Sequence, residues 1–235
     1  MKTKTVLFSL FCIIIFASCS KNIEYTPEYM ERTSGRYLLN QDEIIEVFYD
    51  NEKLFLKWKG AEKIKPVIID NKIFYMVEID EKMHFVQHPE TKAYYLSKLS
   101  KENKDIISYD YIKVEDSFKI PSTYIKLKDY DKALLGYLNI QKQDSTSTIL
   151  EESYFNNLGY NLIREKKYAD AVGVFKINVA LFPKSSNVYD SLAEAYLLSG
   201  DSLQAYNNYK MAFNYDNENN QAKEFVNKYD SKLKK

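Results

Sequence analysis

Residues 155–162, Phe-Asn-Asn-Leu-Gly-Tyr-Asn-Leu, and residues 189–196, Tyr-Asp-Ser-Leu-Ala-Glu-Ala-Tyr, share one pattern of apolar and small side chains at an offset of 34. Later positions keep the same offset: Ala171 with Ala205, and Phe175 with Tyr209. A period of this length indicates paired helices that stack into an array. The sequence therefore predicts two copies of one helical hairpin between residues 151 and 216.

Each repeated position has a mechanical reason. Small residues such as Gly159 and Ala193 let two antiparallel helices approach closely, and the aromatic residues at 155, 175, 189 and 209 fill the space beside them. Neither hairpin can bury its apolar face alone, so the hairpins must stack, and three or more units are normally needed for stability.

A third unit is expected upstream. Residues 129–133, Asp-Tyr-Asp-Lys-Ala, parallel residues 167–171 at an offset of 38, so residues 144–148 are expected to contain an insertion of four. Downstream, residues 220–232 place apolar side chains at helical spacing and predict a terminal capping helix. The helical region is therefore expected to span residues 119–235.

The phrase from Asn157 to Tyr196 resembles the tetratricopeptide repeat. Pro183 lies where that family places its helix-ending proline, whereas the second unit has Asn217 there. The resemblance implies a short α-solenoid that binds another molecule, an unidentified protein or peptide, and catalyses no reaction.

In such an array the first helix of each pair lines the concave face, and residues four apart form a stripe along it. The candidate partner-binding residues are Asn156, Tyr160, Arg164, Asp190, Glu194 and Leu198. Their mixed charge and single aromatic ring suit a peptide or a protein tail. An equally good interpretation is that these are merely solvated positions.

Residues 35–118 show a period of two, which is typical of strands. Ile45, Val47 and Tyr49 alternate with Glu46, Phe48 and Asp50, and turn-forming residues such as Asp70-Asn71 separate the runs. The expected fold class is α+β, with a small antiparallel sheet or barrel-like domain over 35–118 followed by the helical array.

The pattern that includes Gly35-Arg36-Tyr37 and residues 53–56 resembles the small β domain that follows the catalytic domain of some β-lactamase-like serine hydrolases. Tetratricopeptide tails are appended to hydrolases of the same kind. The resemblance implies an accessory chain, because the catalytic domain is missing. The Ser-x-x-Lys motif of these hydrolases occurs only at 18–21 and 231–234, where chance accounts for it, so we expect no enzyme activity.

The N-terminus indicates export. Lys2 and Lys4 precede an apolar run that ends at Cys19, and residues 16–19 resemble the lipobox of bacterial lipoproteins. We therefore expect a signal peptide over 1–18, lipidation of Cys19, and a flexible tether over 19–34. The expected location is the bacterial cell envelope, lipid-anchored at the outer membrane, on a face that the sequence leaves open.

Charge and chemistry exclude other classes. Without Lys2 and Lys4 the chain has 31 basic and 33 acidic residues and no basic block, so nucleic-acid binding is not expected. His84 and His88 lie four apart on an expected strand, about 13 Å, too far for one metal ion. No cofactor is indicated.

Two other functions remain open. A hydrolase could use paired carboxylates such as Glu43 and Glu46, although on a strand these would point to opposite faces. A small-molecule carrier could hold its ligand inside the β domain, although about 80 residues leave little room for a core and a cavity together.

Overall fold

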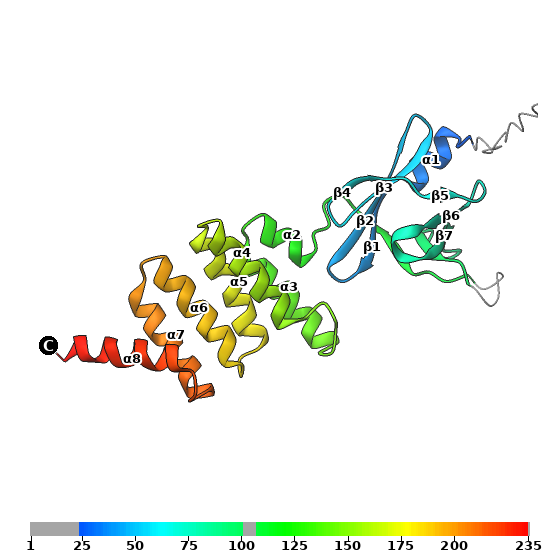
Figure 1. The fold of residues 1–235 in the computed structure, drawn as a ribbon. Coiled ribbons are helices and arrows are strands. Elements are labelled where there is room, and N and C mark those ends of the chain that lie inside the picture. The colour runs from blue at the N-terminus through cyan, green and yellow to red at the C-terminus, as the bar shows by residue number, and fades with distance from the viewer. Residues whose placement is uncertain (1–23, 101–106, 235) are drawn as a thin grey trace, which may run out of the picture.

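The computed structural model describes residues 24–100 and 107–234. The expected signal peptide and Cys19 lie outside these residues. The described chain forms a curled antiparallel sheet followed by an extended stack of helices (Figure 1). None of its helices is both long and apolar enough to cross a bilayer.

The sheet has nine strands in the order β4-β3-β2-β1-β9-β8-β7-β6-β5. The strands are β1 Gly35–Asn40, β2 Glu43–Asp50, β3 Lys53–Trp58, β4 Ala61–Ile64, β5 Val67–Ile68, β6 Ile73–Met76, β7 Glu81–Gln87, β8 Tyr94–Lys98 and β9 Tyr111–Val114. A short 3-10 helix, η1, spans Val77–Ile79. The strands form two series of antiparallel neighbours, β1 to β4 and β5 to β9. Because β1 pairs with β9, the two series make one continuous sheet, and β4 and β5 are its two edges.

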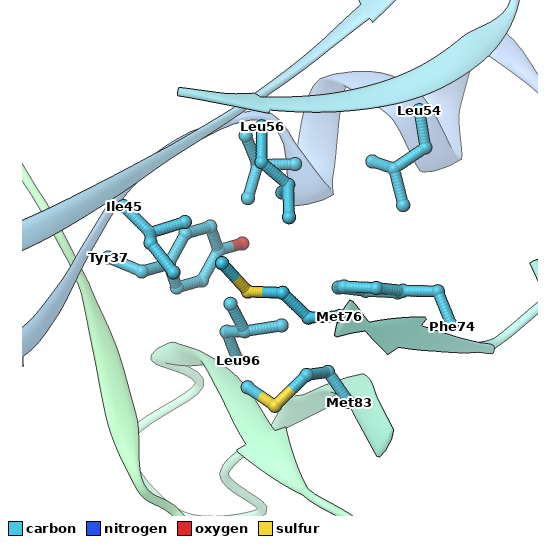
Figure 2. Close-up of a cluster of buried hydrophobic side chains, with 9 residues drawn as sticks. Tyr37, Ile45, Leu54, Leu56, Phe74, Met76, Met83 and Leu96 are labelled. Carbon is cyan, nitrogen blue, oxygen red and sulfur yellow. The ribbon is translucent and has the colours of Figure 1, made fainter. Parts of the chain in front are cut away.

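The curled sheet encloses a core that both series supply (Figure 2). Ile45 and Val47 of β2 point inward, as the period of two predicted, and are almost completely buried. They meet Met76 and Met83 from the other series. The β domain is thus a half-barrel with a packed interior.

Of the flexible tether expected over 19–34, the structure describes residues 24–34, and these include a helix. Residues Pro27–Thr33 form a helix, α1, which Thr26 caps by accepting a hydrogen bond from the Tyr29 backbone N–H. Tyr25 packs edge-on against Tyr49 of β2, and Tyr29 packs against Phe85 of β7. Aromatic side chains bury large areas. The contacts of Tyr25 and Tyr29 therefore hold this segment against the half-barrel.

The helical part comprises α2 Pro121–Lys126, α3 Tyr130–Gln143, α4 Glu152–Arg164, α5 Tyr168–Leu181, α6 Ser186–Leu198, α7 Ser202–Tyr215 and α8 Asn220–Leu233. The first residues of α4, α6 and α8 are 34 apart, as are those of α5 and α7. These seven helices make a longer array than the short solenoid expected (Figure 1). The predicted helical repeat is confirmed.

The repeated positions are buried in both copies. Phe155 and Phe175 are fully buried in one hairpin, as Tyr189 and Tyr209 nearly are in the next. Gly159 lies directly against the Phe175 ring: a Cβ atom there would come within 2.4 Å of Cε1. The close approach expected of this glycine is therefore present.

Candidate functional site

Four side chains of α4 and α6 form a hydrogen-bonded network. The Tyr160 hydroxyl donates to Glu194 Oε2 at 3.0 Å and lies 3.3 Å from Ser191 Oγ. Ser191 in turn donates to Asn156 Oδ1 at 2.8 Å. The structure thus brings together three of the six residues expected on the concave stripe, and it joins them through Ser191.

The other three expected residues are placed differently. Asp190 accepts a hydrogen bond from Asn219, the residue that caps α8, at 2.9 Å. Arg164 is exposed and bonds only within its own helix, to Asn161. Leu198 is 43% exposed at the end of α6. Arg164 and Leu198 are therefore not part of the network.

The network carries the negative charge of Glu194, and Asp190 lies on the same helix. Burial and the neighbouring Glu194 carboxylate raise the pKa of Tyr160 to about 12, against the opposing effect of its hydrogen bond with Ser191, so the hydroxyl stays protonated and donates. Within the described chain, no lysine or arginine forms a salt bridge with Asp190 or Glu194. A partner that presents cationic or hydrogen-bond donor groups would complement this surface.

The same stripe continues on α8, which sequence reasoning treated only as a cap. Glu224 follows Asp190 by one 34-residue period, Lys228 follows Glu194, and Lys232 follows Leu198. All three are exposed. The 34-residue period alone is enough to identify these three positions in the sequence. We call the surface made by Asn156, Tyr160, Asp190, Glu194, Glu224 and Lys228 the repeat face.

A second feature is a cleft of about 1000 Å³ between the outer face of β1–β4 and the helices α2 and α4. Asp42, in the β1–β2 turn, lies at one side of the cleft and connects the sheet to the helical array; we call this connection the joint. Its carboxylate accepts hydrogen bonds from the Ser122 backbone N–H of α2 and from the Tyr137 hydroxyl of α3, both at 2.7 Å. Burial raises the pKa of Asp42, and the bonds from Ser122 and Tyr137 oppose this shift.

Arg36 of β1 holds the segment that links the two parts of the chain. Its Nη1 donates to the backbone carbonyls of Asp116 and Phe118 at 2.9 and 2.7 Å, and to that of Glu115 at 3.3 Å. A guanidinium bonded to three backbone carbonyls within residues 115–118 fixes the direction in which the linker leaves the sheet. Neither Arg36 nor Asp42 was recognisable from the sequence, because each contacts residues about 80 positions away.

Glu43 and Glu46, which were expected on opposite faces of a strand, both line this cleft. Glu46 pairs with Lys57 at 3.1 Å, and Glu43 pairs with Lys59 at 3.3 Å and accepts a hydrogen bond from Trp58. Both carboxylates are thus paired with lysines in the lining of the cleft.

The two histidines lie on β7 and in the turn after it. Burial lowers the pKa of His84, and His88 Nδ1 accepts hydrogen bonds from the backbone N–H groups of Glu90 and Thr91. In residues 24–100 and 107–234, no group of three or more histidine, cysteine or acidic side chains could hold a metal ion.

No family model and no curated protein matches this chain. Among solved structures, it is similar to the first TPR of Spaghetti (RPAP3) bound to the HSP90 peptide SRMEEVD, with 21% identity over 49% of this chain and 88% of that one, and a TM-score of 0.34. It is also similar to the first TPR domain of human RPAP3, with 21% identity, coverage of 48% and 86%, and a TM-score of 0.34. A crystal structure of MamA has 21% identity, coverage of 48% and 65%, and a TM-score of 0.32. Two of these similar structures are thus described as tetratricopeptide (TPR) domains.

Proposed function

We propose that this chain is a lipid-anchored, noncatalytic interaction protein of the bacterial cell envelope, which binds a protein or peptide through its repeat face. The observation that carries the proposal is the pair of carboxylates on α6, Asp190 and Glu194, which form no salt bridge with a described residue and are held in place by Asn219 and Tyr160. A rigid charged surface of this kind recognises a partner without reorganising, which lowers the entropic cost of binding.

The proposal includes the resemblance to accessory regions of serine hydrolases. Nine buried side chains pack together in the interior of the half-barrel (Figure 2). This packing favours an interaction protein over the carrier alternative. The β domain serves instead as a spacer that joins the anchor to the helical array.

Changing charges on the repeat face should abolish partner capture without unfolding the array. Asp190→Asn and Glu194→Gln each remove a carboxylate from the face while leaving an acceptor for Asn219 and Tyr160. We expect each variant to lose crosslinked partner from envelope extracts, since rim and interface charges set association. Lys142→Glu, an exposed change on α3, is the matched control. Unchanged capture by both variants would refute this surface.

The anchor is tested separately. We expect Cys19→Ser to move the protein from the membrane fraction to the soluble fraction, because no acyl chain could then be attached. Mass spectrometry of the N-terminal peptide should show acylation of Cys19 in the unchanged protein. A Cys19→Ser chain that stays in the membrane fraction would contradict lipid anchoring.

A further inference from the structure

The outer face of the β5–β6 hairpin and the start of η1 carry an apolar patch. Val67 is 54% exposed, Ile69 43% and Val77 59%. Val67 lies opposite Tyr75 of β6, Ile73 shares the face of Tyr75 by the period of two, and Val77 follows at the start of η1. Apolar side chains gathered on one exposed face mark contact with something other than water. We call Val67, Ile69, Ile73, Tyr75 and Val77 the hairpin patch.

The hairpin patch lies at the end of the half-barrel where the chain enters from the N-terminus (Figure 1). Asp70, in the β5–β6 turn, is close enough to Tyr25 and Tyr29 that its charge contributes to raising the pKa of both, after burial, which is the main cause. Tyr25 is only six residues from Cys19. Six residues reach at most about 22 Å, so an acylated Cys19 would keep this end of the β domain near the lipid headgroups.

We propose that the hairpin patch rests on the lipid surface and sets the orientation of the β domain on the membrane. The inference depends on the lipid anchor of the proposed function. A tether this short raises the local concentration of the patch at the bilayer, so a few partly buried aliphatic side chains suffice for contact.

The local charges favour an apolar contact over an electrostatic one. Lys65 and Lys72 flank the hairpin, but Asp70, Glu78 and Asp80 are also close in sequence. Net attraction to anionic lipid is therefore small, and the contact should survive high salt, which screens charges but strengthens apolar burial.

A second copy of the chain is a poorer occupant than the membrane. β5 contains only two residues and follows Pro66, which has no backbone N–H to donate. A strand edge this short offers few hydrogen bonds to a partner strand. The apolar side chains, rather than the strand edge, are therefore the feature that needs a partner.

The test tethers the folded chain by the same end without using Cys19. A hexahistidine tag replaces residues 1–19, and the protein is bound to vesicles of phosphatidylethanolamine and phosphatidylglycerol that contain a nickel-chelating lipid. An environment-sensitive fluorophore is attached to Val77→Cys or, as the control, to Leu135→Cys of α3, which is 67% exposed. Residues 20–235 contain no other cysteine, so each variant carries one label.

We expect the emission of the label at 77 to shift to shorter wavelength on vesicle binding, in low and high salt, while the label at 135 does not shift. No shift at 77, an equal shift at both positions, or a shift abolished by salt would overturn the proposal. A shift at 77 that grows with protein concentration in the absence of vesicles would assign the patch to a second copy instead. Because the tag replaces the acyl group, failure here is distinct from failure of the Cys19→Ser fractionation, which concerns the anchor itself.

Discussion

A chain that carries Gly159→Val should lose about 3 kcal/mol of unfolding free energy, at the upper end of the cost of overpacking a core. The three atoms nearest to a Cβ at Gly159 all belong to the ring of Phe175, between 2.4 and 2.9 Å away. That ring is fully buried and packs edge-on against Tyr160, so it has no free space into which to move. The hairpin of α4 and α5 must therefore open to admit the new side chain.

Urea unfolding followed by circular dichroism measures this loss. Asn157→Val is the matched control, since Asn157 is exposed on the same helix and the change introduces the same side chain without a clash. Phe175→Leu should partly rescue Gly159→Val, so that the double variant is more stable than the sum of the single losses implies. Equal losses for Gly159→Val and Asn157→Val would show that the close approach is unimportant.

The helical array was predictable because its signal is local and repeated. Gly159 and Phe175 are only 16 positions apart, and the same pair recurs as Ala193 and Tyr209 one period later. When two copies of a hairpin make the same contact, the same pair of residue types occurs twice in the sequence, one period apart. The continuation of the repeat face onto Lys228 follows from the same period, although it was missed when α8 was read as a cap.

The β domain was predictable only in part. The period of two identified the inward side chains, such as Ile45 and Val47, but alternation shows which face a residue occupies and not which strand lies beside it. The pairing of β1 with β9 joins residues 36 and 114, and no local pattern records a contact of that range. The helix α1 was not predicted for a related reason: Tyr29 of α1 and Tyr25 before it are partly buried only because a distant sheet provides the surface.

Asp42→Ala should cost about 3 kcal/mol and loosen the joint between the sheet and the helical array. The substitution leaves two donors without their acceptor: the Ser122 N–H at the start of α2, and the hydroxyl of Tyr137, a residue with no exposed surface. An unsatisfied buried donor costs roughly 1–3 kcal/mol. Tyr137→Phe removes one donor and keeps the carboxylate bonded to Ser122, so its expected loss is smaller, about 1 kcal/mol.

Two measurements separate a loose joint from general unfolding. Small-angle scattering should show a broader range of overall dimensions for Asp42→Ala, while far-ultraviolet circular dichroism stays unchanged at low temperature. Limited proteolysis should cut near residues 115–120 faster than in the unchanged chain. If Asp42→Ala matches the unchanged chain in both stability and scattering, the joint does not depend on this carboxylate.

The pH dependence of the joint follows from the raised pKa of Asp42, whose main cause is burial. The folded chain then binds this proton more tightly than the unfolded chain, so Asp42 contributes stability below its ordinary pKa of 3.8 and loses it as the pH rises through the raised value. Asp129, Asp144 and Asp170 have lowered pKa values and act in the opposite direction, so the total stability hides the effect. The difference between the unchanged chain and Asp42→Asn removes their contribution. We expect the stability of the unchanged chain relative to Asp42→Asn to fall as the pH rises from 3.8 toward neutrality, and a flat or rising difference would show that the hydrogen bonds from Ser122 and Tyr137 outweigh burial.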